Sequence, residues 1–121
     1  MNLILILSLM NTLTLAAKGP VAKEKFVNEI PTVISNLFCE PKTYFRQCFS
    51  SSEDECKTMA KASAEGCAKE VSPRIPASIE NKEEGGKWGR EIGSCAGTKF
   101  ETQLLSKRIS SAHCKDQAKW K

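Results

Sequence analysis

Apolar residues recur at steps of three and four in the chain beyond residue 20, which is the period of an amphipathic helix. The spacing predicts a helix from Lys23 to Phe38. Pro31 lies inside it, so this helix either kinks there or gives way to a second short helix. The positions of its apolar face are Phe26, Val27, Ile30, Val33, Ile34, Leu37 and Phe38.

Two further helices are predicted downstream, separated by a run of serines. The first follows Pro41 and extends from Lys42 to Phe49, with Tyr44, Phe45, Cys48 and Phe49 on one side. The second begins after Ser52, which can form a capping box with Glu55, and extends to about Glu70. Its inward positions are Cys56, Met59, Ala60, Ser63 and Cys67.

The last part of the chain contains a connector and one more helix. Two prolines predict an extended connector over Val71–Ala77, and a glycine pair ends the polar stretch Ser78–Gly86. A long helix is predicted from Lys87 to about Lys107, followed by an irregular tail. No segment has the two-residue period of a strand, so the pattern predicts an all-α domain of about four helices. The apolar stripe of the last helix is Trp88, Ile92, Cys95, Ala96, Phe100 and Leu104.

The N-terminal residues form an apolar run with no charged side chain before Lys18. Its length of about 15 residues is short of the roughly 20 that a membrane span requires, and small residues follow where a signal peptidase would cut. Residues 1–17 are therefore predicted to be a cleavable signal peptide, with an uncleaved anchor as the alternative. Residues 18–121 are predicted to be one secreted or periplasmic domain without a membrane span, and a monomer.

Six cysteines lie in the predicted domain and none in the signal. An even number in a small exported domain predicts a set of disulfides. There is no Cys-x-x-Cys pair and His113 is the single histidine, so neither a zinc site nor a thioredoxin-type motif is indicated. We expect no metal and no cofactor. The cysteines predicted to be bridged are Cys39, Cys48, Cys56, Cys67, Cys95 and Cys114.

Helix geometry suggests one pairing among the fifteen that six cysteines allow. Cys56 and Cys67 lie about 16 Å apart on one helix, whereas a disulfide needs Cα atoms within roughly 7 Å. If the helix over 42–49 packs antiparallel to the next one, Cys48 meets Cys56 near the turn and Cys39 meets Cys67 further out. The predicted pattern is therefore a nested-disulfide helical hairpin, Cys48–Cys56 inside Cys39–Cys67, with Cys95–Cys114 left over.

The net charge of +4 is concentrated near the C-terminus. Residues 18–96 have 12 basic and 12 acidic side chains, whereas residues 97–121 have six basic and two acidic ones. The basic tail over 106–121 is either simply solvated or binds an anionic partner. Modest charge and few aromatic residues argue against nucleic acid as that partner. The candidate binding residues are Trp88, Lys107 and Arg108.

Three glycines, Gly89, Gly93 and Gly97, recur every four residues in the predicted last helix. Each costs about 0.8–1 kcal/mol relative to alanine, and the spacing places them on one ridge. Close packing of another helix is the simpler interpretation. A groove left open for a ligand or partner is the alternative.

Two groups of residues raise the question of catalysis. His113 and Cys114 with Asp116 could form a cysteine nucleophile and its base, but Cys114 completes the even cysteine set and should be oxidised. The acidic runs over 53–55 and 83–84 fit helix starts and solvated loops better than catalytic carboxylates, which need an enclosing cleft. We therefore expect no catalytic residues and no enzyme activity.

Export, small size and a stapled scaffold favour a non-enzymatic binding protein that acts through protein–protein contact as an inhibitor, effector or toxin-like factor. Its partner is an unknown protein or an anionic surface. The alternative is a carrier of a lipid or small apolar ligand, since disulfide-linked helices can enclose an apolar cavity. The aromatic residues that could line such a cavity are Phe38, Tyr44, Phe45 and Phe49.

Overall fold

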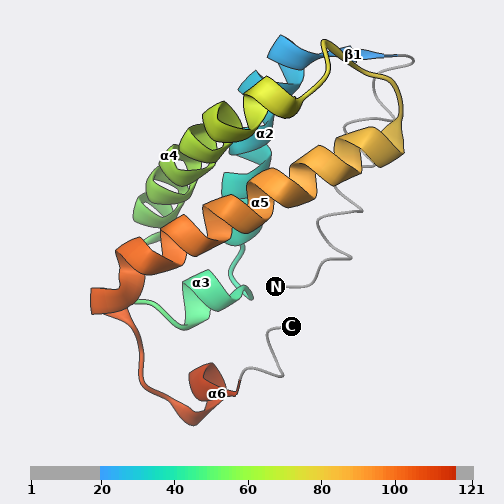
Figure 1. Cartoon of the computed structure of the whole chain (residues 1–121). Helices are drawn as coiled ribbons and strands as arrows, with labels where there is room; N and C mark the ends of the chain where they lie inside the picture. The colour runs from blue at the N-terminus through green and yellow to red at the C-terminus, as the bar shows by residue number, and fades with distance from the viewer. Residues whose placement is uncertain (1–19, 117–121) are drawn as a thin grey trace.

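The computed structural model describes residues 20–116, and three long helices dominate them. They are α2 (Lys23–Phe38), α4 (Glu53–Val71) and α5 (Lys82–Leu104). Helix α4 packs against both α2 and α5, and Figure 1 shows the three as neighbouring rods. The Cys39–Cys56 bridge joins the end of α2 to the start of α4, and the Lys107–Glu55 ion pair joins the end of α5 to the same start. Both α2 and α5 are therefore antiparallel to α4. The prediction of a small, disulfide-stapled all-α domain is confirmed.

Short elements close the two ends of this bundle. One end contains α3 (Tyr44–Gln47), the 3-10 turn η2 (Leu105–Lys107) and α6 (Ala112–Lys115). The other contains β1 (Val21–Ala22), the 3-10 turn η1 (Ser72–Arg74) and β2 (Ser78–Ile79). Figure 1 shows α3 and α6 at one end and β1 at the opposite end. The two-residue strands pair antiparallel, and they correct the expectation of no strand, because two residues are too few to display an alternating pattern.

Most of the core lies on the helix faces that the periodicity predicts, although Phe26, Val27, Val33, Met59 and Cys95 are only partly buried. Helix α2 extends continuously past Pro31, which is buried in it, so the alternative of a second short helix is wrong. The rings of Phe38, Phe45 and Phe100 pack together, with Phe45 4.9 Å from Phe38 and 4.6 Å from Phe100 between ring centroids. Further core side chains are Ile30, Ile34, Leu37, Phe49, Ala60, Ala64, Ala68, Ile92, Ala96 and Leu104.

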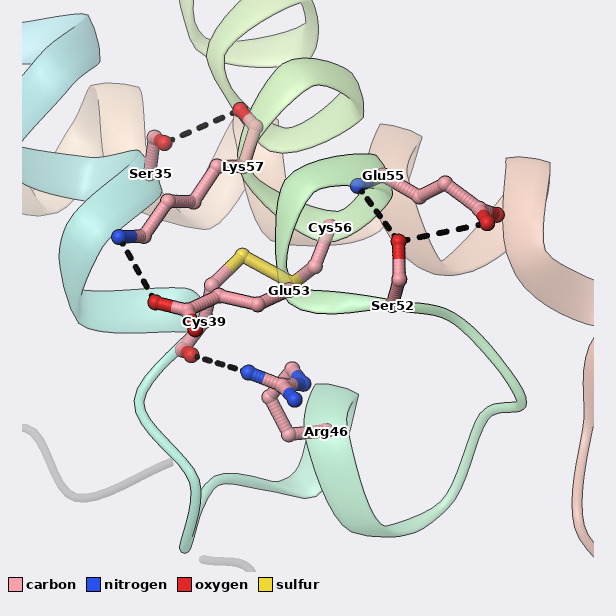
Figure 2. A network of polar contacts seen from close by, with 8 residues as sticks. All are labelled: Ser35, Cys39, Arg46, Ser52, Glu53, Glu55, Cys56 and Lys57. Carbon is pink, nitrogen blue, oxygen red and sulfur yellow. Dashed lines mark hydrogen bonds and ion pairs between the residues drawn. A yellow bond between two sulfur atoms is a disulfide. The ribbon is translucent and has the colours of Figure 1, made fainter.

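Helix α4 begins as the capping box predicts. The Glu55 backbone N–H donates to the Ser52 hydroxyl over 3.1 Å, which satisfies one of the amides that a helix start leaves open. A buried serine then joins α2 to α4, because the Ser35 hydroxyl donates to the backbone carbonyl of Lys57 over 3.0 Å. Figure 2 shows these contacts beside the Cys39–Cys56 bridge and the Glu53–Lys57 ion pair.

Helix α5 begins five residues before the predicted Lys87, and this start was wrong. Asn81 is its N-cap, with the side-chain oxygen accepting from the Glu84 N–H over 3.0 Å. A cap contributes about 1 kcal/mol and Glu83 and Glu84 complement the helix dipole, so together they offset the cost of Gly85 and Gly86. The helix over 42–49 is also shorter than predicted, since α3 covers only Tyr44–Gln47.

All six cysteines are bridged, but each of the three predicted pairings is wrong. The bridges are Cys39–Cys56, Cys48–Cys114 and Cys67–Cys95. The prediction made the helix over 42–49 the antiparallel partner of α4, whereas α2 has that place. Cys39, which caps the end of α2, therefore meets Cys56 in the first turn of α4.

The other two bridges follow from the same arrangement. Cys67 lies late in α4 and faces α5, where it reaches Cys95. Cys48, which directly follows α3, then pairs with Cys114 of α6. The predicted signal peptide over residues 1–17 lies outside the described residues. Within residues 20–116, no helix is both long and apolar enough to cross a membrane.

Candidate functional site

The segment over 105–111, which joins α5 to α6, is held by backbone hydrogen bonds although it contains little regular structure. The backbone N–H of Ser50 donates to the Lys107 carbonyl over 2.9 Å, and that of Ile109 donates to the Cys48 carbonyl over 2.8 Å. Phe49 and Arg108 form an antiparallel bridge between these two bonds. Backbone pairing on this scale fixes the direction in which the side chains of the segment project.

Two large apolar side chains of this segment are exposed to solvent. Leu105 is 54% exposed and Ile109 is 40% exposed, and they are the exposed large hydrophobic side chains within residues 20–116. Lys107 and Arg108 lie between them and are exposed as well. We call Leu105, Lys107, Arg108 and Ile109 the connector surface. An apolar pair around two cations is a composition that suits contact with a partner.

The cations of the connector surface interact with acidic groups of the bundle. Lys107 Nζ lies 3.0 Å from Glu55 Oε2. The hydrogen bond from Lys107, and then its charge, hold the pKa of the Glu55 carboxyl below its ordinary value. Tyr44 donates a hydrogen bond of 2.8 Å to Glu101, and burial followed by this bond raises the pKa of the Tyr44 phenol, while the nearby charge of Arg108 lowers it.

Helix α6 is attached beside the connector surface by a disulfide and by polar contacts. Cys114 is bonded to Cys48, and His113 Nε2 lies 2.9 Å from Gln47 Oε1 on α3. Because Cys114 is oxidised, it cannot act as the thiolate of a Cys–His nucleophile. The interpretation of residues 113–116 as a cysteine nucleophile with its base is therefore excluded for the oxidised protein.

Trp88, the third candidate binding residue, lies far from the other two. It is 7% exposed, with Lys87 Nζ 4.6 Å and the Arg74 guanidinium carbon 5.9 Å from its ring centroid. Sixteen residues of helix separate it from Leu104, which corresponds to about 24 Å. Lys107 and Arg108 therefore share one surface, and Trp88 belongs to the opposite end of the bundle.

Leu105 and Ile109 were not among the predicted site residues. The predicted helix extended to about Lys107, whereas α5 ends at Leu104 and a 3-10 turn follows. If the helix extended to Lys107, Leu105 would lie beside the apolar stripe and nothing would indicate that it is exposed. The sequence does show two aliphatic residues on either side of a Lys-Arg pair, but their exposure can be recognised only when the position of the helix end is known.

The glycine ridge is partly explained by packing. A Cβ at Gly97 would lie 3.7 Å from the Phe38 ring, which places Gly97 at the contact with α2. At Gly93, in contrast, an added Cβ would meet no atom of the described residues within 4 Å. The acidic runs likewise have local roles, since Glu84 Oε2 accepts from the Glu80 N–H over 2.8 Å and Glu53 pairs with Lys57 over 2.9 Å.

One group of side chains in the described residues has the composition of a metal site. Ligand atoms of Cys67, Glu70 and Cys95 lie within 4.8 Å of one another. Two of these ligands are consumed by the Cys67–Cys95 disulfide. In the oxidised protein the sulfurs are therefore not free to bind a cation.

Together, these features define a small helical domain, stapled by disulfides, with a surface of cations and aliphatic side chains. A family model described as the T2SS substrate NttA matches residues 20–108. Since the match covers most of the chain, the protein belongs to this family of substrates of the type II secretion system. It is thus exported, and its disulfides fit a secreted or periplasmic protein. No curated protein and no solved structure matches it.

Proposed function

We propose that this exported protein is a non-enzymatic binding protein that acts through protein–protein contact, as an inhibitor or effector, and that the connector surface makes the contact. The observation that carries the proposal is the exposure of Leu105 and Ile109 on a backbone paired with residues 48–50. Two exposed aliphatic side chains that flank two cations on one hydrogen-bonded segment support a contact surface for a partner.

The composition of the connector surface indicates the chemistry of the partner. Leu105 and Ile109 would enter an apolar patch, while Arg108 and Lys107 would face acidic side chains at its rim. Because the backbone of the surface is already ordered, binding would cost little additional conformational entropy. The expected partner is therefore an acidic protein with an apolar patch.

A photo-crosslinking residue placed at 105 or 109 tests the proposal directly. Incubation with the fluid into which the protein is exported should give one discrete crosslinked species, the same from both positions. A photo-crosslinking residue placed at the exposed Ser94, on the body of α5, should not give this species. The double variant Lys107→Glu/Arg108→Glu should remove the species. A crosslinking pattern at Ser94 equal to that at 105 and 109 would contradict the proposed contact.

An anionic surface is the competing partner, and it would behave differently. Retention on acidic vesicles would then fall as salt rises, and Lys107→Glu/Arg108→Glu would weaken it. Leu105→Ser/Ile109→Ser would leave purely electrostatic retention unchanged, whereas it should weaken a protein contact. The Leu105→Ser/Ile109→Ser variant therefore distinguishes the two partners, since Lys107→Glu/Arg108→Glu should weaken both contacts.

The carrier alternative has less support. The aromatic rings that could line a cavity pack against one another, with Tyr44 and Phe49 5.2 Å apart between centroids. Phe38 and Phe49 are each 1% exposed. Saturable uptake of an apolar dye by the purified protein would revive this alternative.

A further inference from the structure

The Cys67–Cys95 bridge is more accessible than the other two. Cys95 is only partly buried, whereas Cys67 is 0% exposed and the four cysteines of the other bridges are between 0% and 3% exposed. Thiol–disulfide exchange requires a thiolate to reach one of the two sulfurs. We therefore expect an external reductant to reach the Cys67–Cys95 bridge first, from the side of Cys95.

A carboxylate is held against this bridge in a defined orientation. Glu70 Oε2 lies 3.7 Å from Cys95 Sγ, which is a contact and not a hydrogen bond, because a disulfide sulfur has no proton. The other oxygen, Oε1, accepts from Lys99 Nζ over 2.5 Å. Lys99 thus fixes the carboxylate with its second oxygen toward the sulfur, the role that residues behind a metal ligand have in metal sites.

These distances suit a tetrahedral zinc ion once the bridge is open. With Zn–S of about 2.3 Å and Zn–O of about 2.0 Å, a tetrahedral site separates sulfur from oxygen by about 3.5 Å and sulfur from sulfur by about 3.8 Å. The distance from Glu70 Oε2 to Cys95 Sγ is already near the first value. Only the two sulfurs must move apart. Cys67 and Glu70 are three residues apart on α4 and so lie on one face of it.

We propose that the reduced form of the Cys67–Cys95 bridge, together with Glu70, is a binding site for a thiophilic divalent cation such as Zn²⁺. A dithiol reductant transfers two electrons and two protons to the bridge, so that two thiols form and the reductant closes its own disulfide. Cation binding then releases both thiol protons, because the thiolates are the ligands. The site is absent from the oxidised protein and is formed by reduction.

We expect the packing of the bundle to keep the ligands together when this bridge is open. Helices α4 and α5 pack against each other, with Ala60, Ala64 and Ala96 fully buried. The Glu70 and Lys99 side chains are 60% and 42% exposed, which leaves a path for a cation and a solvent ligand from the open side. Three protein ligands and one water are the ligand set of an exchangeable zinc ion.

The first step of the test establishes the order of reduction. The full protein is titrated with a dithiol, the released thiols are alkylated, and the modified cysteines are mapped by mass spectrometry. Cys67 and Cys95 should be labelled before the other four, while the far-UV circular dichroism keeps its helical signal. Earlier labelling of Cys39, Cys48, Cys56 or Cys114 would overturn the proposal.

The second step measures the cation itself, with Co²⁺ as a spectroscopic probe that Zn²⁺ displaces. The partly reduced protein should show thiolate-to-cobalt charge-transfer absorption, and the oxidised protein should not. Glu70→Gln should weaken binding about 10-fold or more, whereas Glu65→Gln, on the exposed side of the same helix, should not change it. Equal affinity of the two variants, or no absorption after reduction, would overturn the site.

Lys99 is a positioning residue in this proposal, and its role has a separate signature. Lys99→Gln should weaken Co²⁺ binding by less than Glu70→Gln does. Lys99→Arg should restore it, because a guanidinium also donates to Glu70 Oε1. If Lys99→Gln tightens binding instead, the lysine only repels the cation and the proposed orientation is wrong.

Discussion

The two ends of the helical bundle are closed by different means. The end that contains α3, α6 and the connector surface has two of the three disulfides, Cys39–Cys56 and Cys48–Cys114. The opposite end has none within the described residues, and it is closed by the β1–β2 pair and by Trp88 under two cations. The third bridge, Cys67–Cys95, lies between the ends, in the α4–α5 interface.

The difference follows from the kind of element that each end keeps in place. Helices α3 and α6 have four residues each, far too few to be stable on their own. The Cys48–Cys114 bond joins the end of α3 to α6, and the Cys39–Cys56 bond fixes the adjoining ends of α2 and α4, so covalent bonds supply what the small apolar faces of α3 and α6 cannot. The Trp88 end consists of long-helix termini and the segment between α4 and α5, where Val71, Ile75, Ile79 and Trp88 are buried and a short strand pair forms. Two of the three disulfides therefore lie at the end where short elements must be held in place, and the connector surface lies at the same end.

Trp88→Ala tests the apolar end and should have the largest effect. The side chain is 7% exposed, and removal of a buried tryptophan costs about 3–5 kcal/mol. Urea unfolding should show this loss in the free energy of unfolding. The control is Lys87→Ala, which removes only a cation over the ring and should cost less than about 1 kcal/mol. If Trp88→Ala and Lys87→Ala lower the free energy of unfolding by equally small amounts, Trp88 does not stabilise this end.

Cys48→Ala/Cys114→Ala tests the stapled end. The bridge spans 66 residues, and the chain-entropy estimate for a loop of that size is about 4 kcal/mol. Hydrogen exchange should rise at α3 and α6 and stay low in the β1–β2 pair. The control pair Cys39→Ala/Cys56→Ala spans 17 residues and should cost about 3 kcal/mol. Unchanged protection of α6 would mean that polar contacts alone attach it.

The same contrast explains how far the sequence could predict the fold. The helix faces of α2, α4 and α5 and the Ser52 cap depend on neighbours within four residues, so local patterns were sufficient for them. The disulfide pairing depends on which helix packs beside α4, and nothing in the spacing of Cys39, Cys48 and Cys56 distinguishes α2 from α3. The connector surface was missed for a related reason, since its exposure depends on pairing between Phe49 and Arg108, 59 residues apart in sequence.

Two buried serines test a smaller contribution near the stapled end. Ser35 and Ser63 are each 4% exposed, but the Ser35 hydroxyl donates to the Lys57 carbonyl, whereas the Ser63 hydroxyl has no partner within residues 20–116. Ser35→Ala should therefore cost about 1 kcal/mol. Ser63→Ala should be neutral or stabilising, because it removes an unsatisfied polar group and improves helix propensity. Thermal unfolding of both variants measures the difference, and equal losses would show that the α2–α4 hydrogen bond contributes nothing.

The smallest effect concerns the ion pair that links the connector surface to α4. Lys107 lowers the pKa of Glu55 from its ordinary value of 4.5, so the folded state binds this proton less readily than the unfolded chain. The pair therefore contributes stability above pH 4.5, and the contribution disappears as the pH falls through the lowered value. In a titration followed by NMR, Lys107→Met should return the pKa of Glu55 toward 4.5. Glu53, whose pKa is lowered by Lys57 on the same helix, is the internal control and should not move. A Glu55 titration that is the same in the variant would mean that backbone bonds alone attach the connector to the bundle.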